Sequence, residues 1–381
     1  MTAKTKKTWR TVRLGDVATL HRGYDLPIEQ MRKGNHPVIF SNGKIERHNE
    51  YKIEGPGVIT GRSGTLGNIF YLSENFWPHN TTLYVSDFHG NDPHFIYYMF
   101  KRLDLAHLNA GSGVPTLNRN HVHEIAVEVP EDRTEQKRIA EILSAFDEKI
   151  ENNNRIIKAL EEMAQAIFKE WFVKFRFPGH AQEEFVKGIP SGWSEKTIGD
   201  VATCNATNHS ALSLPPVINY IDISSVKDGR IHRKDQITFE TAPGRARRKA
   251  ADGDITWSNV RPNLKQYALV LEPETNDVFS TGFTILTARE VPFSFLYLAV
   301  TTEAFISYLV NHATGSSYPA LRSGDFETAK LLIPKASVLD LFDSQCEPML
   351  RQIYILEQQN QKLAALRDLL LPRLMSGEIR V

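Results

Sequence analysis

Residues 139–171 read IAEILSAFDEKIENNNRIIKALEEMAQAIFKEW, and this stretch decides the fold. Steps of four and three residues alternate strictly along it and select Ile139, Leu143, Phe146, Ile150, Asn153, Ile157, Leu160, Ala164, Ile167 and Trp171. This spacing is a heptad seam, which is typical of a helix that packs along another helix. The sequence therefore predicts a long helix with a helical partner.

The flanking residues suit the two ends of such a helix. Thr134 can cap its first turn, Glu135 supplies an acid there, and Pro178-Gly179 is expected to end it. About 40 helical residues span roughly 60 Å at 1.5 Å per residue, which is longer than a globular core needs.

A second seam near the C-terminus can supply the partner. It runs through Phe342, Cys346, Met349 and Ile353 and, shifted by one residue, through Leu356, Gln359, Leu363, Leu366 and Leu370. Pro348 and Pro372 are expected to start, kink or stop helices locally. The polar seam residues Asn153 and Gln359 are expected to fix the register. We expect an antiparallel pair with a globular half at each end; the alternative is that each helix packs on its own domain.

Four segments recur in the same order, which indicates an internal duplication. The pairs are Leu14–Thr19 with Ile198–Thr203, Gly111–Leu117 with Gly315–Leu321, Ile125–Pro130 with Ala329–Pro334, and Asn152–Leu160 with Gln358–Leu366. Each copy begins with short β-type runs, at 57–60, 68–72 and 82–85 and again at 254–257, 267–270 and 283–286. Short helices are expected at 92–108 and 292–312.

These patterns predict an α+β protein with a pseudo-twofold internal duplication. Two globular, mixed α/β domains would be separated by a long antiparallel two-helix coiled coil. The expected boundaries are 1–130 for the first domain, 131–178 for the central helix, 179–336 for the second domain and 337–381 for the C-terminal helix.

Composition excludes several classes of protein. The 381 residues are 41% apolar, and 45 basic residues balance 45 acidic ones. This balance argues against a basic coat protein, and no apolar run is long enough for a membrane span or a secretory signal. Cys204 and Cys346 are expected to be reduced thiols of a cytoplasmic protein.

Motifs for catalysis or metal binding are missing from the sequence. There is no phosphate-binding loop, no H-E-x-x-H and no amino-methyltransferase motif, and Gly61-x-x-Gly64-x-x-Gly67 lacks the dinucleotide spacing. His121-x-His123 is interpreted as incidental. We expect no catalytic residue, no metal and no cofactor bound by this chain.

Polar donors gather in loops of both copies, in a pattern suited to reading DNA. Arg suits guanine O6 and N7, Asn and Gln suit adenine, and Ser and Thr suit bases or phosphates. The alternative is ordinary turn chemistry without a ligand, and the run Arg245–Lys249 could equally be a solvated edge. The candidate DNA-binding residues are Arg62, Ser63, Thr65, Asn68, Asn80, Ser112, Asn118, Arg119, Arg245, Arg247, Arg248, Lys249, Trp257, Ser258, Asn259, Arg261, Asn263, Lys265, Ser316, Ser317, Tyr318 and Arg322.

Several segments resemble the specificity subunit of type I restriction-modification enzymes. Gln136–Ile150 and Ala166–Val173 look like the start and end of that family's central spacer helix, and Leu370–Ile379 resembles its C-terminal helix. Gly188–Trp193, followed by Ile198–Val201, is similar to the entry of a family recognition domain. The loop at 61–67 also resembles a frequent family loop, whereas 257–265 departs from it.

The resemblance implies a non-catalytic subunit that reads double-stranded DNA. Each domain would read one half of a bipartite, asymmetric target, and the spacer would set the gap and dock two methyltransferase subunits. The 60 Å helix suggests readers one to two duplex turns apart. Motor-nuclease subunits would join the larger assembly, and S-adenosylmethionine, ATP and Mg would belong to the partners. The alternatives are a stand-alone DNA-modifying enzyme and a protein scaffold that never touches DNA.

Overall fold

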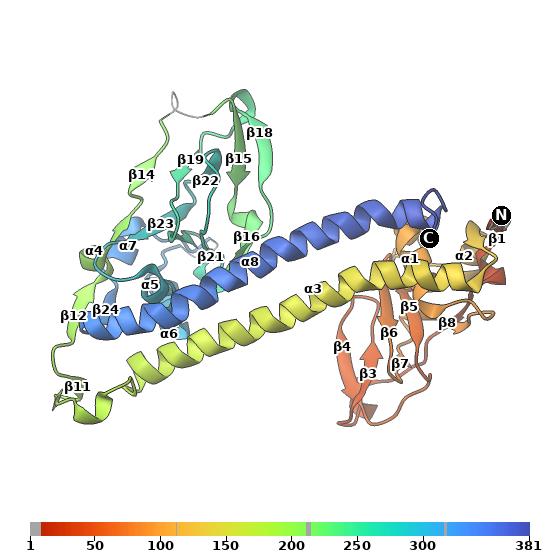
Figure 1. Cartoon of the computed structure of the whole chain (residues 1–381), viewed down its shortest axis with the longest axis horizontal. Helices are drawn as coiled ribbons and strands as arrows, with labels where there is room; N and C mark the ends of the chain where they lie inside the picture. The colour runs from red at the N-terminus through yellow and green to blue at the C-terminus, as the bar shows by residue number, and fades with distance from the viewer. Residues whose placement is uncertain (1–8, 112, 211–214, 316–317) are drawn as a thin grey trace, which may run out of the picture. The chain divides into compact units, whose positions relative to one another are not determined.

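The computed structural model describes residues 9–111, 113–210, 215–315 and 318–381. The chain forms two compact units, which contain both strands and helices (Figure 1). Unit 1 comprises Met1–Asn152 and Gln359–Val381, and unit 2 comprises Asn153–Gln358. Each unit therefore joins a mixed α/β domain to parts of two long helices, as the sequence predicted.

Unit 1 is built on three small sheets and a buried helix. The sheets have the strand orders β2-β8-β5-β6, β4-β3-β7 and β1-β9. The bounds are β1 Trp9–Arg13, β2 Thr19–Arg22, β3 His36–Ile39, β4 Ile45–His48, β5 Gly57–Gly61, β6 Ile69–Leu72, β7 Trp77–Pro78, β8 Thr82–Asp87, β9 Ala126–Pro130, α1 Pro93–Arg102 and α2 Arg119–His123.

Helix α1 begins where the sequence supplies a cap. The Asp92 carboxylate accepts a hydrogen bond from the Phe95 N–H at 2.9 Å, and Pro93 occupies the first turn. The helix buries Phe95, Ile96, Tyr98, Met99 and Phe100 and packs against β5 and β6. It thereby covers the sheet that carries the loop at 61–68.

Unit 2 has a larger strand inventory. Its main sheets have the orders β13-β23-β20-β21 and β14-β19-β22-β15-β18, and three further pairs are β10-β11, β12-β24 and β16-β17. The bounds are β10 Phe185–Val186, β11 Ile189–Pro190, β12 Ser194–Thr197, β13 Ala202–Cys204, β14 Thr207–Asn208, β15 Val217–Ile221, β16 Val226–Lys227, β17 Arg230–Ile231, β18 Asp235–Thr238, β19 Ala246–Lys249, β20 Ile255–Ser258, β21 Tyr267–Leu269, β22 Asp277–Ser280, β23 Phe283–Ala288, β24 Lys330–Ile333, α4 Ile198–Val201, α5 Phe293–Val300, α6 Glu303–His312 and α7 Ser323–Glu327.

The two units repeat one topology. In both four-stranded sheets the first strand in sequence pairs with the fourth, which pairs with the second, which pairs with the third. In both units an entry strand also pairs antiparallel with an exit strand, β1 with β9 and β12 with β24. The recurring sequence segments thus correspond to recurring structure.

Helix α3, Arg133–Phe168, continues into a π-helical turn at Lys169–Val173. All ten predicted seam residues from Ile139 to Trp171 are buried or half-buried, which confirms the heptad interpretation. The predicted ends need correction. The Asp132 carboxylate, not Thr134, caps the helix by accepting from the Thr134 N–H at 2.8 Å, and the helical stretch ends at Val173, ahead of Pro178.

Helix α8, Ala336–Met375, departs from the predicted seam in its second half. Gln359 and Leu366 are exposed, whereas Asn360, Leu363, Arg367 and Leu370, which continue the spacing from Leu356, are half-buried. The prediction that Gln359 lies in the seam was therefore wrong by one residue. Pro348 and Pro372 do not interrupt the helix, because both lie on its exposed side, where the carbonyls that they leave without a partner can face water.

The two long helices run antiparallel within each unit. In unit 2 the Phe168 and Phe342 rings lie 6.1 Å apart, and further along the helices Glu161 and Glu357 both bind Arg230. Residue numbers therefore fall on α3 as they rise on α8. In unit 1 Arg367 binds Asp147, and Leu374 joins the core cluster that contains Ile139 and Leu143.

No single helix within the described ranges is long and apolar enough to cross a membrane, and only the bent pair α5 and α6 passes that test jointly, by length and composition.

Candidate nucleic-acid interface

The loop after β5 is held in unit 1 by backbone hydrogen bonds to two neighbouring segments. The Arg62 N–H donates to the Thr81 carbonyl at 2.8 Å, and the Gly64 N–H donates to the Pro115 carbonyl at 2.9 Å. The Leu117 N–H donates back to the Arg62 carbonyl at 2.8 Å. We call these three bonds the loop frame, with Arg62 at its first position and Gly64 at its third.

Arg62 is oriented by a chain of polar contacts. Its Nε donates to the Asn80 carbonyl at 3.0 Å, and the Asn80 side chain donates to the Asp25 carboxylate. Partial burial and the nearby charge of Arg22 lower the pKa of Arg62, while Asp25 partly offsets them. The Asn80 carbonyl accepts from Nε only, so the two terminal nitrogens of the Arg62 guanidinium take no part in this hydrogen bond.

The other candidate residues in this loop either hold the loop in place through hydrogen bonds or are exposed. The Ser63 carbonyl accepts from the Ser41 hydroxyl at 2.8 Å, and the Asn68 amide donates to the Ser41 carbonyl at 3.2 Å. Both residues therefore brace the loop. Thr65 is exposed.

Asn118 and Arg119 begin helix α2. The Asn118 side chain accepts from the Asn120 N–H at 3.0 Å, which caps the helix, and Arg119 is exposed. His123 of the same helix accepts a hydrogen bond at 2.8 Å from the Leu20 N–H, and burial lowers its pKa. His123 thus braces the fold.

The loop after β20 in unit 2 has the same frame. The Asn259 N–H donates to the Gly282 carbonyl at 2.8 Å, the Arg261 N–H to the Pro319 carbonyl at 2.8 Å, and the Leu321 N–H to the Asn259 carbonyl at 2.7 Å. Asn259 therefore occupies the first position and Arg261 the third.

Trp257 and Ser258 precede this loop and lie in the interior. Both side chains are fully buried, and the Ser258 hydroxyl donates to the Val260 carbonyl at 2.8 Å. The prediction that they contact DNA is therefore corrected, because β20 extends through both residues and Trp257 packs in the core.

Arg261 and the residues after it form the exposed rim of the loop. The Arg261 guanidinium lies 4.6 Å from the ring centre of Tyr318, whose side chain is 69% exposed. Asn263 is exposed, and the Lys265 ammonium forms an ion pair with Glu303. The rim therefore offers one stacked arginine and one lysine that is already paired.

The basic run Arg245–Lys249 lies on and beside strand β19. Arg245 donates to the Tyr220 hydroxyl at 2.9 Å and pairs with Asp222, and Arg248 donates to the Asn208 side chain at 2.8 Å. Arg247 bonds to the Ala246 carbonyl at 2.6 Å, and Lys249 is exposed. Internal partners thus use much of this run's hydrogen-bonding capacity.

The remaining candidates are Ser112, Ser316, Ser317 and Arg322. The three serines lie outside the described residues. Arg322 is exposed at the start of α7, and its N–H donates to the Asp325 carboxylate at 2.6 Å.

Comparison with known proteins shows which family the chain resembles. A model described as "Type I restriction modification DNA specificity domain" matches residues 6–162. The specificity subunit of the type I restriction enzyme MjaIX of Methanocaldococcus jannaschii is 27% identical over 322 residues, which are 75% of this chain and 69% of that protein. The HindI specificity subunit of Haemophilus influenzae is 21% identical over 329 residues, 70% of this chain and 71% of that one. The chain is therefore similar to type I restriction specificity subunits, with the family model matching over residues 6–162.

A solved structure shares the fold of this chain. The S subunit of a type I restriction-modification system from M. genitalium matches with a TM-score of 0.68 at 18% identity, over 98% of both chains.

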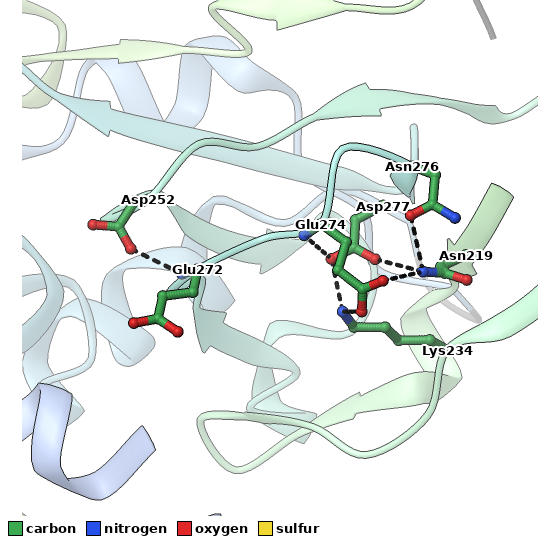
Figure 2. A network of polar contacts seen from close by, with 7 residues as sticks. All are labelled: Asn219, Lys234, Asp252, Glu272, Glu274, Asn276 and Asp277. Carbon is green, nitrogen blue, oxygen red and sulfur yellow. Dashed lines mark hydrogen bonds and ion pairs between the residues drawn. The ribbon is translucent and has the colours of Figure 1, made fainter. Parts of the chain in front are cut away.

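A polar network in unit 2 that the sequence did not predict supports β19. Figure 2 shows the Lys234 ammonium between the carboxylates of Glu274 and Asp277, at 3.3 and 2.7 Å. Burial opposes its charge, but the two carboxylates outweigh burial and raise the pKa of Lys234. The Asn219 amide also donates to both carboxylates and to Asn276. The network fastens β22 to β15, and β22 carries β19.

Ion pairs attach the domain of each unit to the adjacent helix segments. In unit 2 Arg230 of β17 binds Glu161 of α3 at 2.8 Å and also Glu357 of α8. In unit 1 Asp147 of α3 accepts from the Tyr98 hydroxyl of α1 at 2.7 Å and binds Arg367 of α8. A cavity of about 690 Å³ surrounds the Arg230 ion pairs in unit 2. Arg230 is thus paired with two of the carboxylates that line this cavity.

Metal-binding side-chain groups and reactive thiols are both missing from the described residues. Among them no group of three or more His, Cys, Asp or Glu side chains could hold a metal ion. Burial raises the pKa of both the Cys204 and the Cys346 thiol to about 12, so neither is a ready nucleophile at neutral pH.

Proposed function

We propose that this chain is the DNA-reading subunit of a type I restriction-modification complex, with each unit contacting one half of a bipartite, asymmetric duplex target. The observation that carries the proposal is the loop frame, which recurs in both units with different side chains, Arg62 and Gly64 in one and Asn259 and Arg261 in the other. A rigid scaffold with a variable tip is what two readers of different sequences require.

Neutral net charge limits the electrostatic contribution of the chain by itself. Basic and acidic residues balance at 45 each, so the affinity for phosphates must come from local groups such as Arg119 and from partner subunits. Specific contacts to base edges then account for target choice.

The long helices supply a docking surface for two methyltransferase subunits. Ile156 and Met163 of α3 are 40% and 50% exposed, and Leu366 and Leu369 of α8 are 49% and 60% exposed. Apolar side chains in this number on helix surfaces favour a partner that covers them. S-adenosylmethionine, ATP and Mg would be bound by the methyltransferase and motor-nuclease partners.

The decisive experiment exchanges residues 10–130 for those of another family member and maps the methylated sequence with the reconstituted complex. One half of the target should change and the other should stay. An unchanged target would overturn the proposal. Methylation or cleavage by the purified chain alone would favour a stand-alone enzyme, and the absence of salt-sensitive duplex binding would favour a scaffold.

A second experiment tests the helices as a spacer. Deleting one heptad from both α3 and α8 should shorten the gap between the two halves of the target. An unaltered gap would exclude a spacing role for the helices.

A further inference from the structure

The two loop frames differ most at their third position. Gly64 has a φ of +92° and Arg261 a φ of +49°, so both residues lie in the left-handed region. Their N–H groups make equivalent bonds, to Pro115 and to Pro319. Unit 2 therefore has an arginine at the position where unit 1 has a glycine.

We propose that Arg261 is the residue through which unit 2 discriminates a base, and that guanine is the base it selects. Its counterpart in unit 1 is Arg62, two positions earlier in the same frame. This assignment rests on the proposed function and adds a specificity-determining residue to it. An arginine suits guanine because its planar fork matches O6 and N7 together.

Asn259, at the first position in unit 2, is poorly placed to read a base. Its Oδ1 accepts from the Thr284 hydroxyl at 2.6 Å, and its Nδ2 lies 3.4 Å from the Thr281 carbonyl. The amide that would otherwise recognise adenine is therefore engaged within the fold. The reading role falls to another residue of the loop.

The contact between Arg261 and Tyr318 suits that role. At 4.6 Å from the ring centre, the guanidinium uses its face for stacking. Its N–H donors lie in the guanidinium plane, so stacking on the ring and hydrogen bonding in the plane use different parts of the group. Stacking therefore stiffens the side chain and lowers the entropy lost when it binds a base.

Backbone conformation is a second difference between the two units at this position. A non-glycine residue at positive φ costs free energy that glycine would not. Unit 1 shows that glycine fits the third position of the frame. Unit 2 therefore carries an extra free-energy cost at this position, which Arg261→Gly would remove.

The test is Arg261→Gly in the full chain, assembled with its methyltransferase partners and assayed on a library of target sequences. Discrimination at one base pair in the second half-site should fall about ten- to hundred-fold, with the first half-site unchanged. The variant should unfold at the same temperature as the wild type or higher, because glycine relieves the strain. A loss of preference therefore cannot be attributed to misfolding.

Lys187→Gly is the matched control. Lys187 is an exposed cation of unit 2 with a φ of +52°, in the hairpin between β10 and β11. Its replacement removes one charge and one strained residue but should leave target preference intact. Arg261→Lys separates base from phosphate contact, because lysine keeps the charge and loses the fork.

Three outcomes would overturn the assignment. These are full discrimination in Arg261→Gly, full discrimination in Arg261→Lys, and equal losses in Arg261→Gly and Lys187→Gly. The proposed function would survive each of them, since the wild-type complex would still read both half-sites. Only a wild-type complex without sequence preference would remove the function itself.

Discussion

The loops at 61–68 and 257–266 have the same backbone hydrogen bonds. They stand on different buried strand residues, which we call the foundation of each loop. Position 60, at the end of β5, is a buried threonine, and the equivalent position in β20 is the buried Trp257. In unit 1 the arginine is oriented by the Asn80 carbonyl, and glycine takes the left-handed position. In unit 2 the arginine takes that position itself and stacks on Tyr318.

The comparison distinguishes the backbone hydrogen bonds that hold each loop from the side chains at its tip. The frame depends on backbone groups, so it survives a change of every side chain at its tip. The buried residues below the loop can therefore differ between the units, and so can the side chains at the loop's tip, while the backbone hydrogen bonds stay the same. Each prediction below alters one of these layers in one unit and uses the other unit as a reference.

The largest effect is expected from Trp257→Ala. The Trp257 ring packs 4.8 Å from Tyr267 and 6.3 Å from Phe305, and removing a fully buried tryptophan should cost roughly 3–5 kcal/mol. Hydrogen exchange should show faster opening of β20 and β23, with β5 and β8 unchanged. Trp257→Phe should lose much less. Equal loss of protection in both units would contradict the independence of the two foundations.

A smaller, pH-dependent effect is expected from Arg230→Met, which removes the ion pairs between unit 2's domain and its helix segments. Burial raises the pKa of Glu357, and the charge of Arg230 opposes that rise. A carboxyl whose folded pKa lies above its unfolded value weakens the fold as pH rises through that interval. Without Arg230 the folded and unfolded pKa values of Glu357 lie further apart. The loss in the free energy of unfolding should therefore reach roughly 2–3 kcal/mol at pH 7.5, after allowance for partial exposure, and be smaller at pH 5.

Denaturant unfolding at the two pH values measures this difference. The control is Arg233→Met, which removes an exposed arginine paired with Asp235 at 2.9 Å and should change stability little at either pH. A loss from Arg230→Met that is as large at pH 5 as at pH 7.5 would show that packing, not charge, is what Arg230 supplies.

The helices show how far sequence periodicity reaches. The seam of α3 could be predicted residue by residue, because heptad spacing follows from local helix geometry. The seam of α8 was misplaced at Gln359 and Leu366, since apolar residues there are compatible with two phases one residue apart. Tertiary partners decide between such phases, as Asp147 does when it binds Arg367 inside the seam.

The sequence indicated which loops could form the interface, but not which of their side chains are exposed. Polar residues among glycines identified both loops, yet alternation could not show that β20 extends through Trp257 and Ser258. The left-handed conformation of Arg261 had no sequence signal, because nothing but the frame imposes it. The Lys234 network also escaped, since it joins residues from separate strands.

Arg62→Ala should affect target choice more than stability. We expect it to relax discrimination by roughly 1–2 kcal/mol at one base pair of the first half-site, because a bidentate contact to guanine is lost. The second half-site should not change, and methylation of a target library measures both. The control is Arg10→Ala, which removes an exposed arginine from β1 in a different sheet of unit 1. Uniform weakening across all sequences would make Arg62 a phosphate contact.

The smallest effect concerns the foundation of unit 1. The Thr60 hydroxyl is buried and has no hydrogen-bond partner among the described residues, whereas the Thr82 hydroxyl on the adjacent strand donates to the His79 carbonyl at 2.7 Å. Replacing Thr60 by valine keeps the shape and removes an unsatisfied group, so the free energy of unfolding should stay level or rise by up to about 1 kcal/mol. Thr82→Val should lower it by about 1 kcal/mol, because a made hydrogen bond is lost. Thermal unfolding of the two variants compares them directly. Equal destabilisation would mean that the Thr60 hydroxyl binds a buried water, and the foundation of unit 1 would then be a polar one, unlike the aromatic foundation that Trp257 provides in unit 2.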